Sequence, residues 1–182
     1  AECLIPLIDK NEDQAIKTAT QIIANIQTIY EQKWLDMMKS KLGLIGDNKD
    51  DLKLINSLLN WMEESKADYT NTFCYLMDMP IKDEIYNDKR FMEWVQAWNN
   101  RSNLNNSNKE NQFQLMKKVN PVIIPRNHKV EEALSNANKN NYETLYKLLS
   151  VIQNPYSPKI DILEFQSPAP ISKEKYQTFC GT

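Results

Sequence analysis

The stretch NEDQAIKTATQIIANIQTIYEQKWLDMMKSKLG, residues 11–43, decides the fold class. It opens on Asn11, two acidic residues and Gln14, which is the pattern of a helix N-terminal capping box. From Ile16 onward apolar residues recur every three or four positions, as they do on one face of an α-helix. Gly43 is typical of the residue that ends such a helix. The sequence therefore predicts one long amphipathic helix, which must pack against another surface along its length.

The same spacing continues through most of the chain, with caps and prolines marking the boundaries. Residues 121–125 differ, because two prolines favour an extended conformation there. The fold class expected is all-α, a multi-helix unit. Two further helices are expected to start near Asp47–Asp51 and after Asp68. The others are expected at about Asp83–Asn99, through Phe113–Met116, at Asn127–Ala137 and at Tyr142–Ile152.

The last part of the chain loses the helical pattern. Prolines at positions 155, 158, 168 and 170 favour an extended tail that runs over a surface. We predict a helical region at residues 1–153 and an extended, proline-rich C-terminal tail at residues 154–182. The chain opens on an apolar run without a methionine, so we expect it to be a cut fragment.

Composition argues against several classes of function. The formal net charge is −2, and the lysines are scattered, whereas nucleic-acid binding needs a clustered basic surface. Phe91, Trp94 and Trp98 have the spacing of a buried helix face, not of a base-stacking platform. No apolar run approaches the roughly 20 residues that cross a bilayer. We expect no nucleic acid and no membrane as partners, and a soluble, cytoplasmic protein.

Catalytic and metal-binding patterns are also missing. The chain has three glycines, too few and too dispersed for a phosphate-binding loop, and one histidine, which cannot form a histidine pair for zinc. That histidine, His128, is interpreted as solvent-facing or capping rather than catalytic. The sequence therefore predicts no catalytic, cofactor-binding or metal-ligating residue within this chain.

The three cysteines form no C-x-x-C pair and cannot all pair internally. Cys74 lies in an apolar helical context and is expected to be a buried filler, and we expect the same of Cys3. Cys180 lies in a polar setting three residues from the end, where a thiol is reachable by oxidants or by another cysteine. An unremarkable tail residue is the equal alternative for Cys180.

Several short motifs follow one another in a characteristic order over nearly the whole chain. In this order they resemble the C-terminal part of the selenoprotein O (SelO, YdiU-like) family. The motifs are Leu4-Ile5-Pro6-Leu7-Ile8, Lys41-Leu42-Gly43-Leu44, Asp68-Tyr69-Thr70 with Phe73, Asn120-Pro121 with Pro125-Arg126-Asn127, Asn154-Pro155-Tyr156 and Phe179-Cys180-Gly181-Thr182.

The resemblance implies a fold and an activity for the parent protein. The family is a pseudokinase family with a protein-kinase-like fold, whose members transfer AMP from ATP to Ser, Thr or Tyr hydroxyls of target proteins. ATP and Mg²⁺ would be cofactors of the parent, and its partners would be protein substrates and the missing N-terminal catalytic region. The family's nucleotide-binding and metal-binding residues lie upstream of this chain, which would be the later, helical part of the C-lobe.

One functional position carries over from the family. Cys180 matches the near-terminal cysteine or selenocysteine, which the resemblance implies is redox-regulatory and pairs with a cysteine near the catalytic region. Pro125-Arg126-Asn127-His128 lacks the Asp and Asn offsets of a kinase catalytic loop, so it is interpreted as a turn in which Asn127 caps the next helix. The alternative hypothesis is a stand-alone helical protein-interaction module without enzymatic activity.

Overall fold

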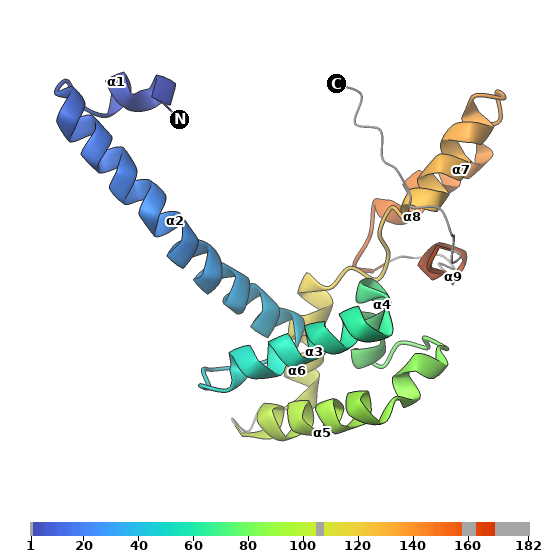
Figure 1. Cartoon of the computed structure of the whole chain (residues 1–182). Coiled ribbons are helices and arrows are strands. Elements are labelled where there is room, and N and C mark those ends of the chain that lie inside the picture. Colours follow the sequence, from blue (N-terminus) through green and yellow to red (C-terminus); the bar gives the residue numbers. More distant parts are fainter. Residues whose placement is uncertain (1, 105–107, 158–162, 170–182) are drawn as a thin grey trace.

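The computed structural model describes residues 2–104, 108–157 and 163–169, and the regular structure in these ranges is helical throughout (Figure 1), which confirms the predicted all-α class. Its 3₁₀ helices are η1 (Glu2–Leu4) and η2 (Glu84–Asn87). Its α-helices are α1 (Ile5–Ile8), α2 (Glu12–Lys41), α3 (Asp51–Ser65), α4 (Tyr69–Leu76), α5 (Lys89–Asn103), α6 (Lys109–Val119), α7 (Asn127–Ala137), α8 (Glu143–Ile152) and α9 (Leu163–Gln166).

The long helix α2 begins and ends as its sequence predicts. The side chain of Asn11 accepts a hydrogen bond from the Gln14 backbone N–H at 3.0 Å, which satisfies one of the free donors of the first turn. At the other end, the Leu44 N–H donates to the Lys39 carbonyl at 2.9 Å, and Gly43 between them has φ +63°. This is a Schellman ending, in which the left-handed residue is most easily a glycine.

The C-terminal end of α2 packs on α6 at this glycine. A Cβ added at Gly43 would lie 2.4 Å from Cγ of Gln112 and 2.9 Å from its backbone oxygen. Gln112 is itself buried and donates from Nε2 to the Ser102 hydroxyl at 2.9 Å. Backbone conformation and close approach thus both require glycine here.

The core lies among α3, α4, α5 and α6 and is rich in aromatic rings. Trp61 stacks on Phe91 with ring centroids 4.3 Å apart, and Tyr75 stacks on Tyr86 at 4.2 Å. Stacked rings of this kind contribute beyond the area that they bury. The Trp98 indole N–H donates to the Leu42 carbonyl at 2.9 Å, which ties α5 to the end of α2.

The predicted burial of one face of α5 is confirmed. Phe91, Trp94 and Trp98 are 0%, 7% and 5% exposed. These rings therefore form a buried helix face, as their spacing predicts, and not an exposed base-stacking platform.

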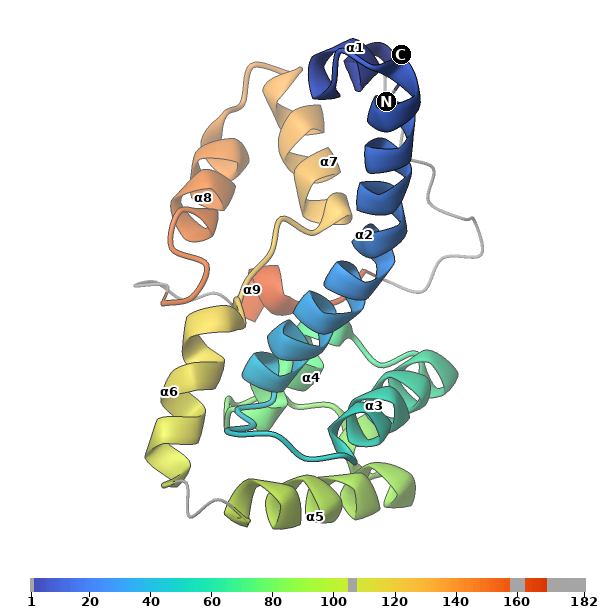
Figure 2. The same ribbon diagram turned by 90° about the vertical axis from the view of Figure 1, so that its left-hand side faces the viewer.

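The α7–α8 pair and α9 form the other end of the molecule, where α7 and α8 lie side by side (Figure 2). The Val122 N–H donates to the Pro155 carbonyl at 2.8 Å, so the extended segment before α7 meets the segment after α8. Within the expected tail, α9 is one helical turn that buries Phe165 and Gln166. Residues 163–166 are therefore helical and not extended, because these two side chains find a place in the core.

Two helix starts differ from the prediction. The helix expected from Asp83 is divided, since Asp83 caps η2 and Asp88 caps α5 by accepting from the Arg90 N–H at 2.7 Å. Two acceptors five residues apart each end the preceding turn and start a new one. The prediction that Asn127 caps α7 was wrong, because Asn127 is already the first helical residue and the N-cap position belongs to Arg126.

The N-terminal two thirds of α2 stand away from the rest of the bundle (Figure 1). An apolar stripe runs along this part of the helix, and its side chains are between 44% and 66% exposed. We call it the α2 stripe; it consists of Ile16, Ile22, Ile23, Ile26, Ile29 and Tyr30. α1 packs on the start of α2, where Ala15 is buried, but the stripe itself stays exposed, although its amphipathic pattern predicts packing along the whole helix.

Candidate functional site

The structure describes two of the three cysteines to which the sequence analysis gave a role. Cys180 is outside the described residues. Cys74 is 0% exposed, and burial raises the pKa of its thiol to about 11, so it stays protonated near neutral pH, as expected of an apolar filler. The expectation that Cys3 is buried was wrong: Cys3 lies in η1, which contains no buried residue, and is exposed.

His128 is half-buried in the first turn of α7. Partial burial, together with the positive charges of Lys129 and Arg126, lowers the pKa of its imidazole below the ordinary value. The ring is therefore neutral at pH 7.

The neighbouring Arg126 has a structural partner on another helix. Its guanidinium donates to both carboxylate oxygens of Asp68, at 2.6 and 3.0 Å, and to the Asn71 side-chain oxygen at 3.2 Å. Burial opposes ionisation of Asp68, but the hydrogen bonds from Arg126 and from the Asn71 backbone outweigh it and hold the pKa of the carboxyl below its usual range. The turn at residues 125–127 is thus anchored to the start of α4, which agrees with its interpretation as a turn.

The same network reaches α9. Asn71 Nδ2 donates to the Gln166 backbone oxygen at 3.1 Å, and Gln166 Nε2 donates to the Val122 carbonyl at 3.0 Å. Asp68 and Arg126 each lie in a motif noted in the sequence, Asp68-Tyr69-Thr70 and Pro125-Arg126-Asn127. Nothing in the sequence indicates that these two residues pair. Gln166 carries no signal, because it lies in the segment expected to be extended.

A second buried ion pair fixes the loop between α2 and α3. Arg101 on α5 donates to Asp51 at 2.6 and 3.0 Å and to the Gly46 carbonyl at 3.2 Å. Both side chains are under a tenth exposed. A paired fork of this kind satisfies charges that would be costly to bury alone.

Lys41, at the end of α2, is a buried lysine whose ammonium lies over two aromatic rings. It is 8% exposed, and its ammonium lies 4.4 Å from the Phe73 ring centroid and 5.2 Å from that of Tyr69. Burial lowers the pKa of the amine. The two ring faces stabilise the cation that burial disfavours.

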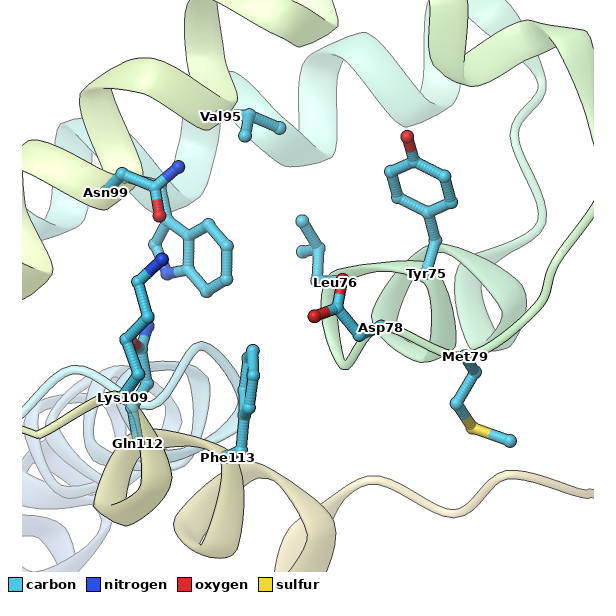
Figure 3. Close-up of a pocket in the computed structure, with 10 residues that line it drawn as sticks. Tyr75, Leu76, Asp78, Met79, Val95, Asn99, Lys109, Gln112 and Phe113 are labelled. Atoms are coloured by element: carbon cyan, nitrogen blue, oxygen red, sulfur yellow. The ribbon is translucent and has the colours of Figure 1, made fainter.

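A hollow bounded by α4, α5 and α6 (Figure 3) has a volume of about 340 Å³. We call it the α4–α6 pocket. Asp78 lies on its α4 side, in the turn after that helix, and Lys109 lies on its α6 side; both side chains extend toward the space in the figure. Trp98 and Phe113 supply aromatic walls. No local pattern in the sequence predicts this pocket, because its lining comes from three separate helices.

Residues 2–104, 108–157 and 163–169 contain no cluster of three or more His, Cys, Asp or Glu side chains placed to hold a metal ion. In the same ranges no helix combines the length and the apolar character that crossing a bilayer requires.

Comparison with known proteins places the chain in a family. Its residues 1–153 match the sequence profile described as protein adenylyltransferase SelO. Over its whole length it is 51% identical to a protein nucleotidyltransferase YdiU of Pelagibacter ubique, and 42% identical to proteins of that name from Nitrosococcus oceani and Bacillus cereus. It spans 38%, 37% and 38% of these three relatives. The chain therefore belongs to the SelO family of protein adenylyltransferases.

Proposed function

We propose that this chain is the helical C-terminal part of a protein adenylyltransferase. The complete protein would transfer AMP from ATP, with Mg²⁺, to Ser, Thr or Tyr hydroxyls of target proteins in the cytoplasm. Support comes from family membership and from the identity of 51% over the whole chain. The part played by this chain would be to support a kinase-like catalytic region, without transferring AMP itself.

The observation that carries the supporting role is the α2 stripe. Leaving a large aliphatic side chain in water forgoes about 1.5–3 kcal/mol relative to burying it. The stripe exposes four isoleucines at 55–58% on one face of a single helix. A contiguous apolar surface of this kind marks an interaction site. We assign as its partner the part of the family protein that this chain does not span.

Cys180 would add regulation to this support. Its thiol would form a disulfide with a cysteine of the catalytic region, the two thiols giving up two electrons and two protons to a cellular oxidant. A disulfide between the two parts would then change AMP transfer with redox state.

The supporting role is tested by expressing the chain together with the remainder of the Pelagibacter ubique relative. The chain alone is expected to transfer no label from ATP labelled at its α-phosphate, whereas the two parts together should give Mg²⁺-dependent labelling of protein. Labelling by the chain alone would contradict the proposal.

The role of the stripe is tested with Ile26→Asp, which replaces an exposed stripe residue. We expect it to weaken association with the remainder by at least about tenfold and to reduce labelling accordingly. The control is Thr28→Asp, because at 100° per residue Thr28 lies on the opposite side of the same helix. Circular dichroism should show unchanged helix content in both variants, since both positions are exposed. Equal weakening by the two variants would contradict a docking role for the stripe.

A stand-alone interaction module is the second candidate, because the same exposed stripe would suit a foreign partner. Solution size and dye binding separate the two. A monomer that binds no hydrophobic dye would count against the hypothesis that the chain is part of a larger lobe. Dye binding that is suppressed by the remainder of the Pelagibacter ubique relative would count against the stand-alone module.

A further inference from the structure

The α4–α6 pocket combines a defined volume with two opposite charges. Its volume of about 340 Å³ lies at the small end of the range for ligand-binding pockets. Asp78 and Lys109 enter it from different sides, with Phe113 between them in the view of Figure 3. Among the described residues, neither charged side chain has a hydrogen-bond or ion-pair partner.

The backbone position of each charged residue is set by a helix end. Asp78 has φ +59° and follows α4 in a Schellman ending, where the Met79 N–H donates to the Cys74 carbonyl at 3.1 Å. Lys109 is the first residue of α6, whose N-cap Asn108 accepts from the Glu110 N–H at 3.1 Å. The charges thus stand on two defined backbone positions, one on each side of the pocket.

The walls between the charges combine apolar side chains with polar groups. Phe113 contributes an aromatic ring, Val95 an aliphatic surface and Asn99 an amide (Figure 3). The ring of Trp98 also lines the space. Trp98 is held in place by its hydrogen bond to the Leu42 carbonyl at 2.9 Å. A ligand body that fills the space would therefore meet Phe113, Val95 and the small exposed part of a Trp98 ring that is already held in place.

We propose that the α4–α6 pocket binds a small zwitterion with an apolar body, of the class of a free hydrophobic amino acid. The ammonium would meet Asp78 and the carboxylate would meet Lys109 and Asn99. The side chain would pack on Phe113 and on the small exposed part of Trp98. A simple cation would face Lys109 and a simple anion would face Asp78. A neutral apolar ligand would desolvate both charges without pairing them. This inference does not depend on the proposed function.

The experiment uses L-phenylalanine as the probe and the 182-residue chain. The readout is the indole N–H nuclear magnetic resonance signal of Trp98, one of four tryptophans in the chain. We expect a saturable shift of the Trp98 signal and an unchanged signal from Trp34 on α2. Phenylalaninamide, which lacks the carboxylate, and N-acetylphenylalanine, which lacks the ammonium, should each bind at least about tenfold more weakly, since each loses one charged hydrogen bond.

Two variants test the protein side. Asp78→Gly should lose binding by at least about tenfold while the melting temperature stays equal or rises, because glycine adopts the left-handed conformation without strain. Lys109→Gln should weaken phenylalanine binding to a similar degree, whereas Lys117→Gln, an exposed position on the same helix, should leave it unchanged. Asp78→Gly thus separates binding from folding.

Three results would overturn the proposal. These are no saturable shift of Trp98, equal binding of phenylalanine and its two single-charge analogues, and unchanged binding by Asp78→Gly. Tight binding of phenylalaninamide alone would assign the pocket to cations instead and would equally refute a zwitterion site.

Discussion

At the scale of single residues, the molecule depends on buried or half-buried charges that pair across long sequence separations. Asp68 and Arg126 lie on different helices, and their pair links the start of α4 to the start of α7. Sequence motifs marked both residues, but a pair this far apart follows only from the fold. Arg126 therefore has a structural role, although it stands two residues before the single histidine of the chain.

We predict that Asp68→Asn lowers the free energy of unfolding by about 3 kcal/mol at pH 7, since it leaves Arg126 charged and unpaired. Asparagine keeps the helix cap, so the loss measures the charge alone. The folded pKa of Asp68 lies below its unfolded value near 3.9. The stabilisation is therefore complete above that value and is lost as pH falls through the folded pKa.

Urea denaturation over a pH series measures both effects. Asp83→Asn is the matched control, because Asp83 also caps a helix, η2, but forms no ion pair among the described residues. It should change the free energy of unfolding by less than about 0.5 kcal/mol. A loss equal to that of Asp68→Asn would refute the assigned role of the pair.

At the scale of elements, the sequence predicted helix ends correctly where a single cap acceptor or a single glycine marks the boundary. Asn11, Gly43 and Asp68 behave as predicted, because each has one local hydrogen-bonding role. Asp83 and Asp88 did not, since two acceptors compete and tertiary packing of Tyr86 decides between one helix and two. Local chemistry predicts a cap, but not which of two caps is used.

We predict that Gly43→Ala destabilises the chain by about 2–4 kcal/mol, of which about 1–2 comes from the left-handed backbone and the rest from the clash with Gln112. Thermal unfolding measures the change. Lys66→Gly, at a left-handed position that ends α3, isolates the backbone contribution with the opposite sign and should stabilise by up to about 1 kcal/mol. If Gly43→Ala left the free energy of unfolding unchanged, that result would contradict the close packing of α2 on α6.

At the scale of the whole molecule, periodicity predicted the all-α class and the order of the helices, and the order of motifs predicted the family. The α4–α6 pocket could not be predicted, because its walls come from helices whose relative placement no local pattern records. The uncovered α2 stripe shows the converse: an amphipathic sequence predicts a buried face, but the surface that buries it need not belong to the same 182 residues.

The labelling rates of the three thiols test which cysteines are accessible in the folded chain. We predict that a water-soluble disulfide reagent labels Cys180 and Cys3 rapidly under native conditions, and Cys74 only at the rate of unfolding, because Cys74 is 0% exposed and its thiol has a pKa of about 11. Cys180 should be the fastest, as its polar sequence context predicts. Cys3→Ser and Cys180→Ser assign the two fast phases. Moderate urea should accelerate only the slow phase, and Cys74 labelling as fast as Cys180 would contradict both the buried position of Cys74 and the exceptional accessibility expected of Cys180.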